Sequence, residues 1–140
     1  MNFEVVFLGT GSAIPTQKKN HSGILVKSQN ETILIDCGEG IQRQFKMAQE
    51  NPCKLTKILI THWHEDHTLG LAGLLKTLGM MTYSKTLQIY GPPGTIEKFN
   101  TLQHLYSRFK IQIQIKEVTS KVLENSELLI EAAKMDHGIY

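Results

Sequence analysis

The sequence predicts an α/β fold in which strands alternate with helices in one domain, residues 1–140. Short apolar runs bounded by glycine, proline or asparagine have the length and composition of buried strands. Between several of these runs, apolar residues recur at helical spacing instead. A chain of 140 residues can bury one hydrophobic core, and no repeat or change in composition divides it.

The individual elements follow from these patterns in chain order. Each predicted strand is an apolar or alternating run that ends at a turn signal, and these runs cover residues 3–8, 23–27, 32–35, 57–60, 86–90, 111–115 and 127–134. The predicted helices lie between them and cover residues 41–49, 69–80 and 95–108. Thr95 is the expected N-cap of the last helix, and residues 120–126 are expected to form a turn.

The composition is that of an ordinary globular protein, with 41% hydrophobic and 20% charged residues. The formal net charge of +2 permits an anionic substrate without requiring one. The two cysteines, Cys37 and Cys53, form no disulfide framework, and the sequence has no secretory signal or membrane-length apolar run. We therefore expect a cytoplasmic protein without a membrane partner.

A cluster of histidines and a carboxylate follows the predicted strand at residues 57–60. His62, His64, Asp66 and His67 fall within six positions, and their side chains are natural donors for zinc and related divalent ions. In an extended segment His62 and His64 project to one side and can share one ion. Asp66 and His67 would open the next helix and face a second ion. The cluster therefore predicts a dinuclear centre suited to metal-assisted hydrolysis.

Two further residues at strand ends are candidates for the same site. Asp36 follows an apolar strand and precedes Cys-Gly, where its carboxylate can orient an imidazole ligand and fix its tautomer. A turn-forming role is the alternative for Asp36. His137 follows the last predicted strand and could complete a three-histidine shell with His62 and His64, or be a polar surface residue.

A polar loop before the second predicted strand is the best anion-binding candidate outside the cluster. Lys18, Lys19 and Asn20, with backbone amides near glycines, can hold a phosphate, although lysine pairs are also common on surfaces. His21, at the end of this loop, and His104 have no neighbours at ligand spacing.

Taken together, these motifs resemble the metallo-β-lactamase superfamily and, within it, the ribonuclease Z family. The resemblance runs over essentially the whole chain. Its motifs are Phe-Leu-Gly-Thr-Gly-Ser-Ala-Ile-Pro near the start, Ile-Asp-Cys-Gly-Glu-Gly at residues 35–40, the segment 61–75 with its Gly-Leu-Ala-Gly-Leu-Leu extension, Tyr-Gly-Pro-Pro-Gly at residues 90–94, and His137.

The resemblance implies the N-terminal half of an αββα sandwich, a mixed sheet with flanking helices, because the family continues well beyond the third metal motif. It implies that His62, His64 and His137 bind one zinc ion and that Asp66 and His67 bind a second. Asp66 would also be the catalytic proton acceptor. The remaining ligands, including a bridging aspartate and a final histidine, would lie in the half that this chain lacks.

The implied activity is cleavage of precursor tRNA at its 3′ end, leaving a 3′-hydroxyl on the tRNA and a 5′-phosphate on the trailer. The implied enzyme is a homodimer with two zinc ions in each complete site. Gln17 and Lys19 replace the lysine and arginine of the family's Pro-x-Lys-x-Arg-Asn loop. Because lysine lacks the bidentate fork of arginine, recognition of the tRNA end by Lys18, Lys19 and Asn20 is expected to differ.

Two alternatives stay open at the level of sequence. One is another hydrolase on the same scaffold that acts on thioesters, lactams or cyclic nucleotides, since the same metal chemistry attacks many electrophiles. The other is an inactive fragment that binds zinc.

Overall fold

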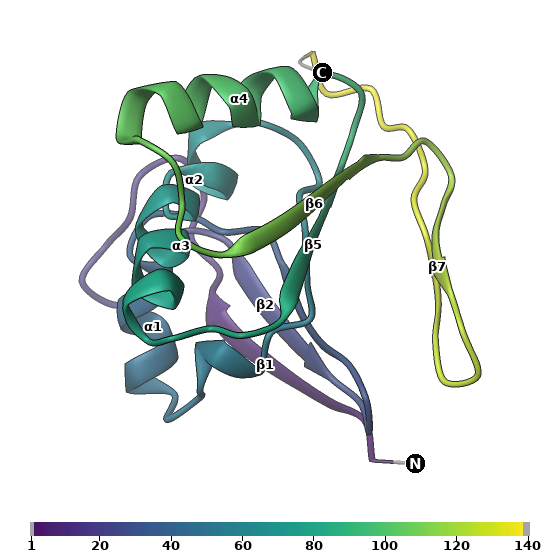
Figure 1. The fold of residues 1–140 in the computed structure, drawn as a ribbon, viewed down its shortest axis with the longest axis horizontal. Helices are drawn as coiled ribbons and strands as arrows, with labels where there is room; N and C mark the ends of the chain where they lie inside the picture. The colour runs from purple at the N-terminus through teal and green to yellow at the C-terminus, as the bar shows by residue number, and fades with distance from the viewer. Residues whose placement is uncertain (1, 139–140) are drawn as a thin grey trace.

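The computed structural model describes residues 2–138, and its main element is a six-stranded mixed sheet with helices along one face (Figure 1). The strands of the sheet are β1 (Glu4–Gly9), β2 (Gly23–Lys27), β3 (Thr32–Ile35), β4 (Lys57–Leu59), β5 (Thr86–Gly91) and β6 (Gln112–Glu117). The helical segments are α1 (Ile41–Met47), η1 (Pro52–Lys54, a 3-10 turn), α2 (Glu65–Thr68), α3 (Leu71–Met80) and α4 (Thr95–Tyr106). None of the helices in residues 2–138 is both long and apolar enough to cross a membrane.

The sheet changes from antiparallel to parallel pairing at β3. Strands β1, β2 and β3 form an antiparallel ladder, whereas β3, β4, β5 and β6 run parallel. Parallel neighbours need crossover connections, which are supplied by α1, by α2 with α3, and by α4. The carboxyl ends of β3, β4 and β5 therefore meet at one edge, and the segments that begin at Asp36 and Thr61 both start there.

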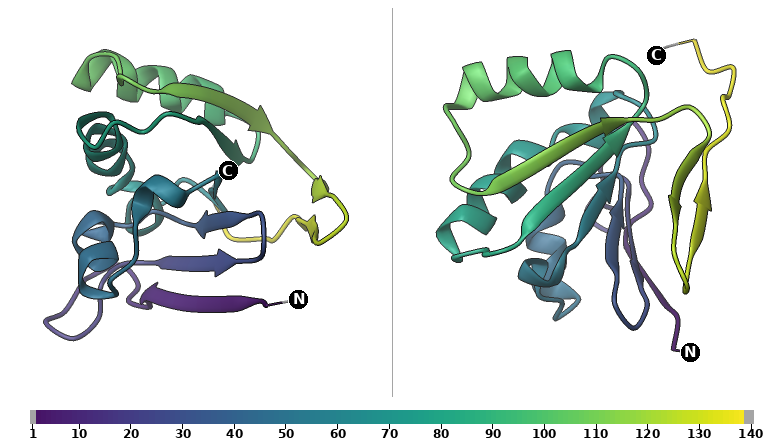
Figure 2. Two further views of the ribbon diagram at one scale, coloured as in Figure 1. Left: turned by 60° about the horizontal axis from the view of Figure 1, so that its bottom comes forward. Right: turned by 45° about the vertical axis from the view of Figure 1, so that its right-hand side comes forward.

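A separate ribbon, β7 (Lys121–Glu124) paired with β8 (Leu129–Glu131), lies on the sheet face away from the helices (Figure 2). Its apolar side chains pack against Ile33, Leu59 and Tyr90 of that face. At the turn of the ribbon, the Glu127 carboxylate accepts hydrogen bonds from the Ser28 hydroxyl (2.9 Å) and the Asn30 backbone N–H (3.3 Å). These contacts anchor the ribbon to the β2–β3 turn.

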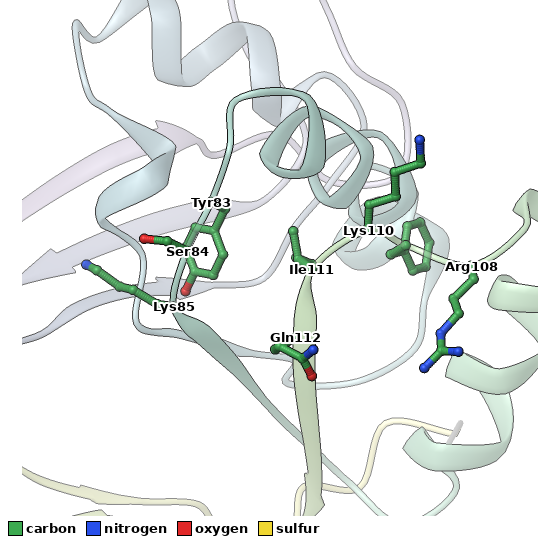
Figure 3. Close-up of a pocket in the computed structure, with 8 residues that line it drawn as sticks. Tyr83, Ser84, Lys85, Arg108, Lys110, Ile111 and Gln112 are labelled. Atoms are coloured by element: carbon green, nitrogen blue, oxygen red, sulfur yellow. The ribbon is translucent and has the colours of Figure 1, made fainter.

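The amino ends of β5 and β6 form the opposite end of the sheet from Asp36 and Thr61. Residues 83–85 and 108–112 line a shallow hollow at this end (Figure 3). The side chains of Lys85, Arg108 and Lys110 are exposed around it. None of the ion pairs within residues 2–138 involves these three cations, so their charge is not neutralised locally.

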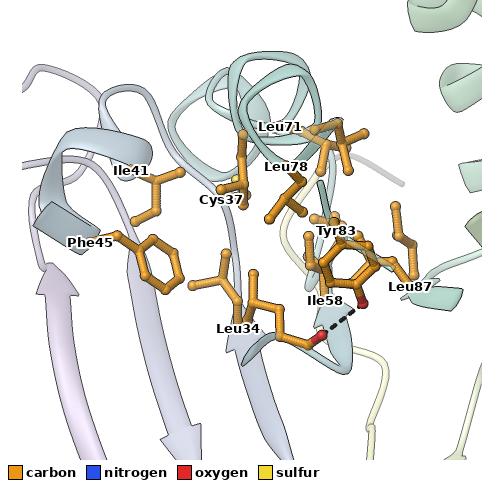
Figure 4. Close-up of a cluster of buried hydrophobic side chains, with 14 of the residues drawn as sticks. Leu34, Cys37, Ile41, Phe45, Ile58, Leu71, Leu78, Tyr83 and Leu87 are labelled. Atoms are coloured by element: carbon orange, nitrogen blue, oxygen red, sulfur yellow. Dashed lines mark hydrogen bonds between the residues drawn. The ribbon is translucent and has the colours of Figure 1, made fainter. Parts of the chain in front are cut away.

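The hydrophobic core lies between the helices and the sheet (Figure 4). Its fully buried members include Phe45 of α1, Leu78 of α3 and Ile58 of β4. Tyr83 enters this core from the loop before β5, and its hydroxyl donates a hydrogen bond to the Leu55 carbonyl (2.7 Å). Burial raises the pKa of Tyr83 to about 12, so the phenol is a neutral donor at physiological pH.

The predicted α/β class is confirmed, but two local predictions are wrong. Residues 121–124 form strand β7 and are not part of the turn. The turn begins only at Asn125, whose N–H donates a hydrogen bond to the Leu128 carbonyl (3.0 Å). The N-cap of α4 is Gly94, with a left-handed φ of 91° that suits glycine. Thr95 instead donates its hydroxyl to the Pro92 carbonyl (2.7 Å).

Replacing Tyr83 by phenylalanine is expected to lower the free energy of unfolding by about 1–3 kcal/mol, because the buried Leu55 carbonyl loses its hydroxyl donor. Urea denaturation of the two proteins measures this difference. The matched control is Tyr106→Phe, which removes the same atom from an exposed side chain and should change stability by less than about 0.5 kcal/mol. Equal losses in the two variants would contradict the structural role of the Tyr83 hydroxyl.

Candidate metal centre

Asp36 is the buried carboxylate around which the site is built. It follows β3 in a left-handed conformation (φ 61°) that aspartate tolerates better than most residues, and its side chain is almost completely buried. Its Oδ1 accepts hydrogen bonds from both the backbone N–H and the hydroxyl of Thr61 (2.9 Å each). Its Oδ2 lies 2.6 Å from Nδ1 of His67. Asp36 therefore joins the end of β3 to the histidine segment after β4.

His67 is oriented by this contact. A carboxylate only accepts hydrogen bonds, so Nδ1 of His67 carries the proton that it donates to Asp36. Its Nε2 lies 3.5 Å from Oδ2 of Asp66. Both residues belong to α2, which begins after His64, where the His64 carbonyl accepts the His67 N–H (3.1 Å). This one-turn helix places an imidazole nitrogen and a carboxylate side by side.

His62 is oriented by Asp36 through Thr61. The Thr61 hydroxyl donates to Asp36 and lies 3.0 Å from Nδ1 of His62, so Nδ1 is the donor in this contact and Nε2 is left with its lone pair. Nε2 is buried and has no hydrogen-bond partner among residues 2–138. Burial, followed by the nearby His67 and His64, lowers the pKa of His62. An orphaned basic nitrogen in this position fits a metal ligand.

His137, from a distant part of the chain, joins His62 and His64 of the segment after β4. His62, His64 and His137 each offer one ligand atom, and all three atoms lie within 4.8 Å of one another. Their ring centroids are 4.6–5.0 Å apart, and the His67 ring is 4.2 Å from that of His62. The residues present therefore fit a divalent ion such as zinc, which takes imidazole nitrogens in this number.

The loop after β1 contacts the Asp66 carboxylate through a backbone hydrogen bond. The backbone N–H of Ala13 donates to Oδ2 of Asp66 at 2.9 Å. This hydrogen bond is the main reason that the pKa of Asp66 is lowered, because it stabilises the ionised carboxylate.

Trp63, between His62 and His64 in sequence, connects the histidine segment to the core and to α4. Its side chain packs against the core, and its indole Nε1 donates to the Thr95 hydroxyl (2.9 Å). The ring is thus fixed between the histidine segment and the first turn of α4.

The three residues predicted to hold a phosphate are not part of this cluster. Lys18 and Lys19 are exposed, and their backbone N–H groups bind the Thr16 hydroxyl (3.3 and 3.0 Å). The amide nitrogen of Asn20 donates to the Glu39 carbonyl (2.6 Å), so it bridges two loops. A role in substrate binding stays a prediction for these residues.

Two contributors to the site are not marked by the sequence. Thr61 connects Asp36 to His62, and its only signal is its place directly before the first histidine. Ala13 acts through its backbone N–H, which no residue type reveals.

Comparison with known proteins extends the picture from the site to the chain. Residues 3–129 match the model of a family described as Anti-Pycsar protein Apyc1. The ribonuclease Z of Methanococcus aeolicus is 40% identical over 143 residues, covering 97% of this chain and 44% of that protein. The ribonuclease Z of Methanocaldococcus jannaschii is 43% identical, with the same coverage. The chain thus spans somewhat less than half the length of these curated relatives.

Solved structures agree with the predicted fold. The crystal structure of human tRNase Z, short form, superposes with a TM-score of 0.73 at 36% identity, covering 81% of this chain and 44% of that one. The metallo-β-lactamase fold protein YhfI from Bacillus subtilis matches with a TM-score of 0.69 at 23% identity, covering 87% and 48% of the two chains. The chain therefore belongs to the family described as Anti-Pycsar protein Apyc1, and it has the metallo-β-lactamase fold that it shares with its ribonuclease Z relatives.

Proposed function

We propose that this chain is the N-terminal part of a zinc-dependent endoribonuclease that trims precursor tRNA at its 3′ end, leaving a 3′-hydroxyl on the tRNA and a 5′-phosphate on the trailer. The observation that carries the proposal is the meeting of His62, His64 and His137 around an orphaned nitrogen. It gains weight from 40% identity to a ribonuclease Z over nearly the whole chain.

The side chains divide the work as follows. His62, His64 and His137 would hold one zinc ion, and Asp66 with His67 would hold a second. Two ions in such a centre polarise a phosphoryl oxygen and lower the pKa of water at the site. Asp66 would accept the proton of the attacking water, since its lowered pKa keeps the carboxylate ionised. Asp36 would keep the imidazoles of His67 and His62 in the tautomers that binding requires.

The second ion needs more donors than Asp66 and His67 supply, since structural and catalytic zinc sites use three or four protein ligands. We propose that a further segment or a second chain completes the centre. An uncovered apolar row supports this proposal, because Phe3, which precedes β1, and Val5 and Phe7 of β1 occupy alternate positions and are 55%, 42% and 66% exposed. From the resemblance to ribonuclease Z, we also propose that the complete protein is a cytoplasmic homodimer.

The distribution of charge supports a polyanionic substrate. Residues 67–116 contain six basic residues and a single acidic one, whereas the formal net charge of the whole chain is only +2. Lys85, Arg108 and Lys110 of this segment surround the hollow at the amino ends of β5 and β6 (Figure 3). A surface that concentrates unpaired cations attracts the phosphate backbone of RNA.

A hydrolase for a smaller phosphodiester, such as a cyclic nucleotide, is the second candidate. Residues 3–129 match the family described as Anti-Pycsar protein Apyc1, whose description does not name ribonuclease Z. We therefore retain this second candidate. Both candidates share the metal centre and differ in what lies around it.

The first test measures cleavage of a precursor tRNA by the protein, expressed with whatever coding sequence follows residue 140 in frame. We expect cleavage at the 3′ trailer, and loss of that cleavage in His64→Ala because a metal ligand is removed. His104→Ala, an exposed histidine on α4, is the control and should cleave normally. Cleavage retained by His64→Ala would contradict the assignment of the site. Turnover of a cyclic nucleotide without cleavage of tRNA would favour the second candidate.

The second test measures metal content. Elemental analysis of the purified 140-residue chain should find no more than one tightly bound zinc ion. Asp36→Asn should weaken zinc binding in a chelator competition by about 10–100-fold, because the oriented imidazoles lose their carboxylate partner. Two tight zinc ions per chain would contradict the half-site picture.

The third test addresses the basic hollow. Replacing Lys85, Arg108 and Lys110 together by glutamine should reduce the salt dependence of tRNA binding, lowering the slope of log K against log [salt] by about 2–3. The control replaces the exposed Arg43, Lys98 and Lys121, which changes the net charge equally at other places. Equal effects in the two triple variants would show that net charge alone, and not this surface, determines binding.

A further inference from the structure

We propose that His21 is a positioning residue that holds a strained turn at Ala13 against Asp66 and so fixes the orientation of the Asp66 carboxylate. The inference rests on the function proposed above for Asp66. It is carried by the geometry of residues 12–14, the burial of His21 and the close packing of two glycines against its main chain and Cβ.

The turn at Ala13 is strained. Ala13 has a φ of 50°. The Ile14 N–H donates a hydrogen bond to the Ser12 carbonyl (2.5 Å), which closes a three-residue γ-turn with a positive φ, the rarer form of this turn. A non-glycine residue in this conformation persists only where its surroundings hold it. The side chain of Ile14 is 78% exposed, so packing of the turn into the core does not supply that restraint.

Two hydrogen bonds hold Ala13, one at each end of the residue. Its N–H donates to Oδ2 of Asp66 at 2.9 Å, and its carbonyl lies 3.1 Å from Nε2 of His21. Because a carbonyl only accepts, Nε2 of His21 is the donor. The ring therefore fixes Ala13, and Ala13 occupies one oxygen of the Asp66 carboxylate. The other oxygen is left in a defined direction for a metal ion or a proton.

The main chain and Cβ of His21 pack closely against two glycines. A side chain at Gly38 would place its Cβ 2.3 Å from Cβ of His21 and 2.5 Å from the Asp66 carbonyl oxygen. A Cβ at Gly9 would lie 1.8 Å from the His21 carbonyl oxygen. The Cβ and carbonyl group of His21 are thus packed between Gly9, at the end of β1, and Gly38, in the loop after β3, which leaves little space for the base of the side chain to shift.

Burial of this ring carries a cost that an apolar side chain would avoid. His21 is 3% exposed, and its Nδ1 has no hydrogen-bond partner among residues 2–138. A buried polar atom without a partner destabilises the folded state. The one interaction in which histidine is superior to leucine here is the hydrogen bond from Nε2 to Ala13, which points to positioning rather than stability.

The test compares His21→Leu, which has no donor, with His21→Gln, whose side-chain amide can donate to the same carbonyl. Exchange of the Ala13 amide hydrogen reports the turn directly and needs neither metal nor substrate. We expect exchange about 10-fold faster in the folded His21→Leu protein. In the protein with a completed centre, the affinity of the second site, which Asp66 helps to form, for Co²⁺ should be about 10-fold lower, as followed by the visible absorption of the bound ion. His21→Gln should restore both, and kcat should fall with KM unchanged if the protein cleaves RNA.

Several outcomes would overturn the inference. A folded His21→Leu protein with the exchange rate and Co²⁺ affinity of the wild type would do so, as would a folded His21→Gln protein that restores neither. His104→Leu is the control for loss of an exposed imidazole. If His21→Leu does not fold, His21→Met, which also lacks a donor but packs more adaptably, replaces it in the same comparison. A protein that never cleaves RNA but shows these shifts would refute the proposed substrate and leave the positioning role intact.

Discussion

The contact between the buried Asp36 carboxylate and the segment after β4 is the interaction on which the site depends. One oxygen receives two hydrogen bonds from Thr61, and the other binds Nδ1 of His67. A single carboxylate thereby sets the tautomers of two imidazoles that approach the centre from different directions. Asp36 makes these contacts from a left-handed backbone conformation, with a φ of 61°. Loss of the carboxylate would therefore release both imidazoles at once.

The sheet explains why this contact forms where it does. Parallel pairing of β3, β4 and β5 brings the ends of three strands to one edge, and the polar residues that follow them meet there without any contribution from the strands themselves. The helices cover one face and bury the core, whereas the ribbon covers only part of the other.

The sequence points to the local part of this candidate site, because the potential donors His62, His64, Asp66 and His67 are concentrated in one short segment. It also places most strands and helices, since their apolar patterns are regular. It fails where a backbone group or a distant pairing decides the structure. The ribbon strand at 121–124 depends on its partner β8, the cap of α4 depends on the positive φ of Gly94, and the contribution of Ala13 is made by an amide that every residue except proline carries.

The return of His137 to the cluster, after the β7–β8 ribbon, also has a thermodynamic consequence. A metal ion bound by both His64 and His137 would act as a cross-link between two points about 70 residues apart. In the chain-entropy treatment of covalent cross-links, closing a loop of that length disfavours the unfolded ensemble by about 4 kcal/mol. Part of the metal affinity would then appear as resistance to unfolding, and the exposed segment 132–138, which carries His137, would be the first to detach when the ion is withdrawn.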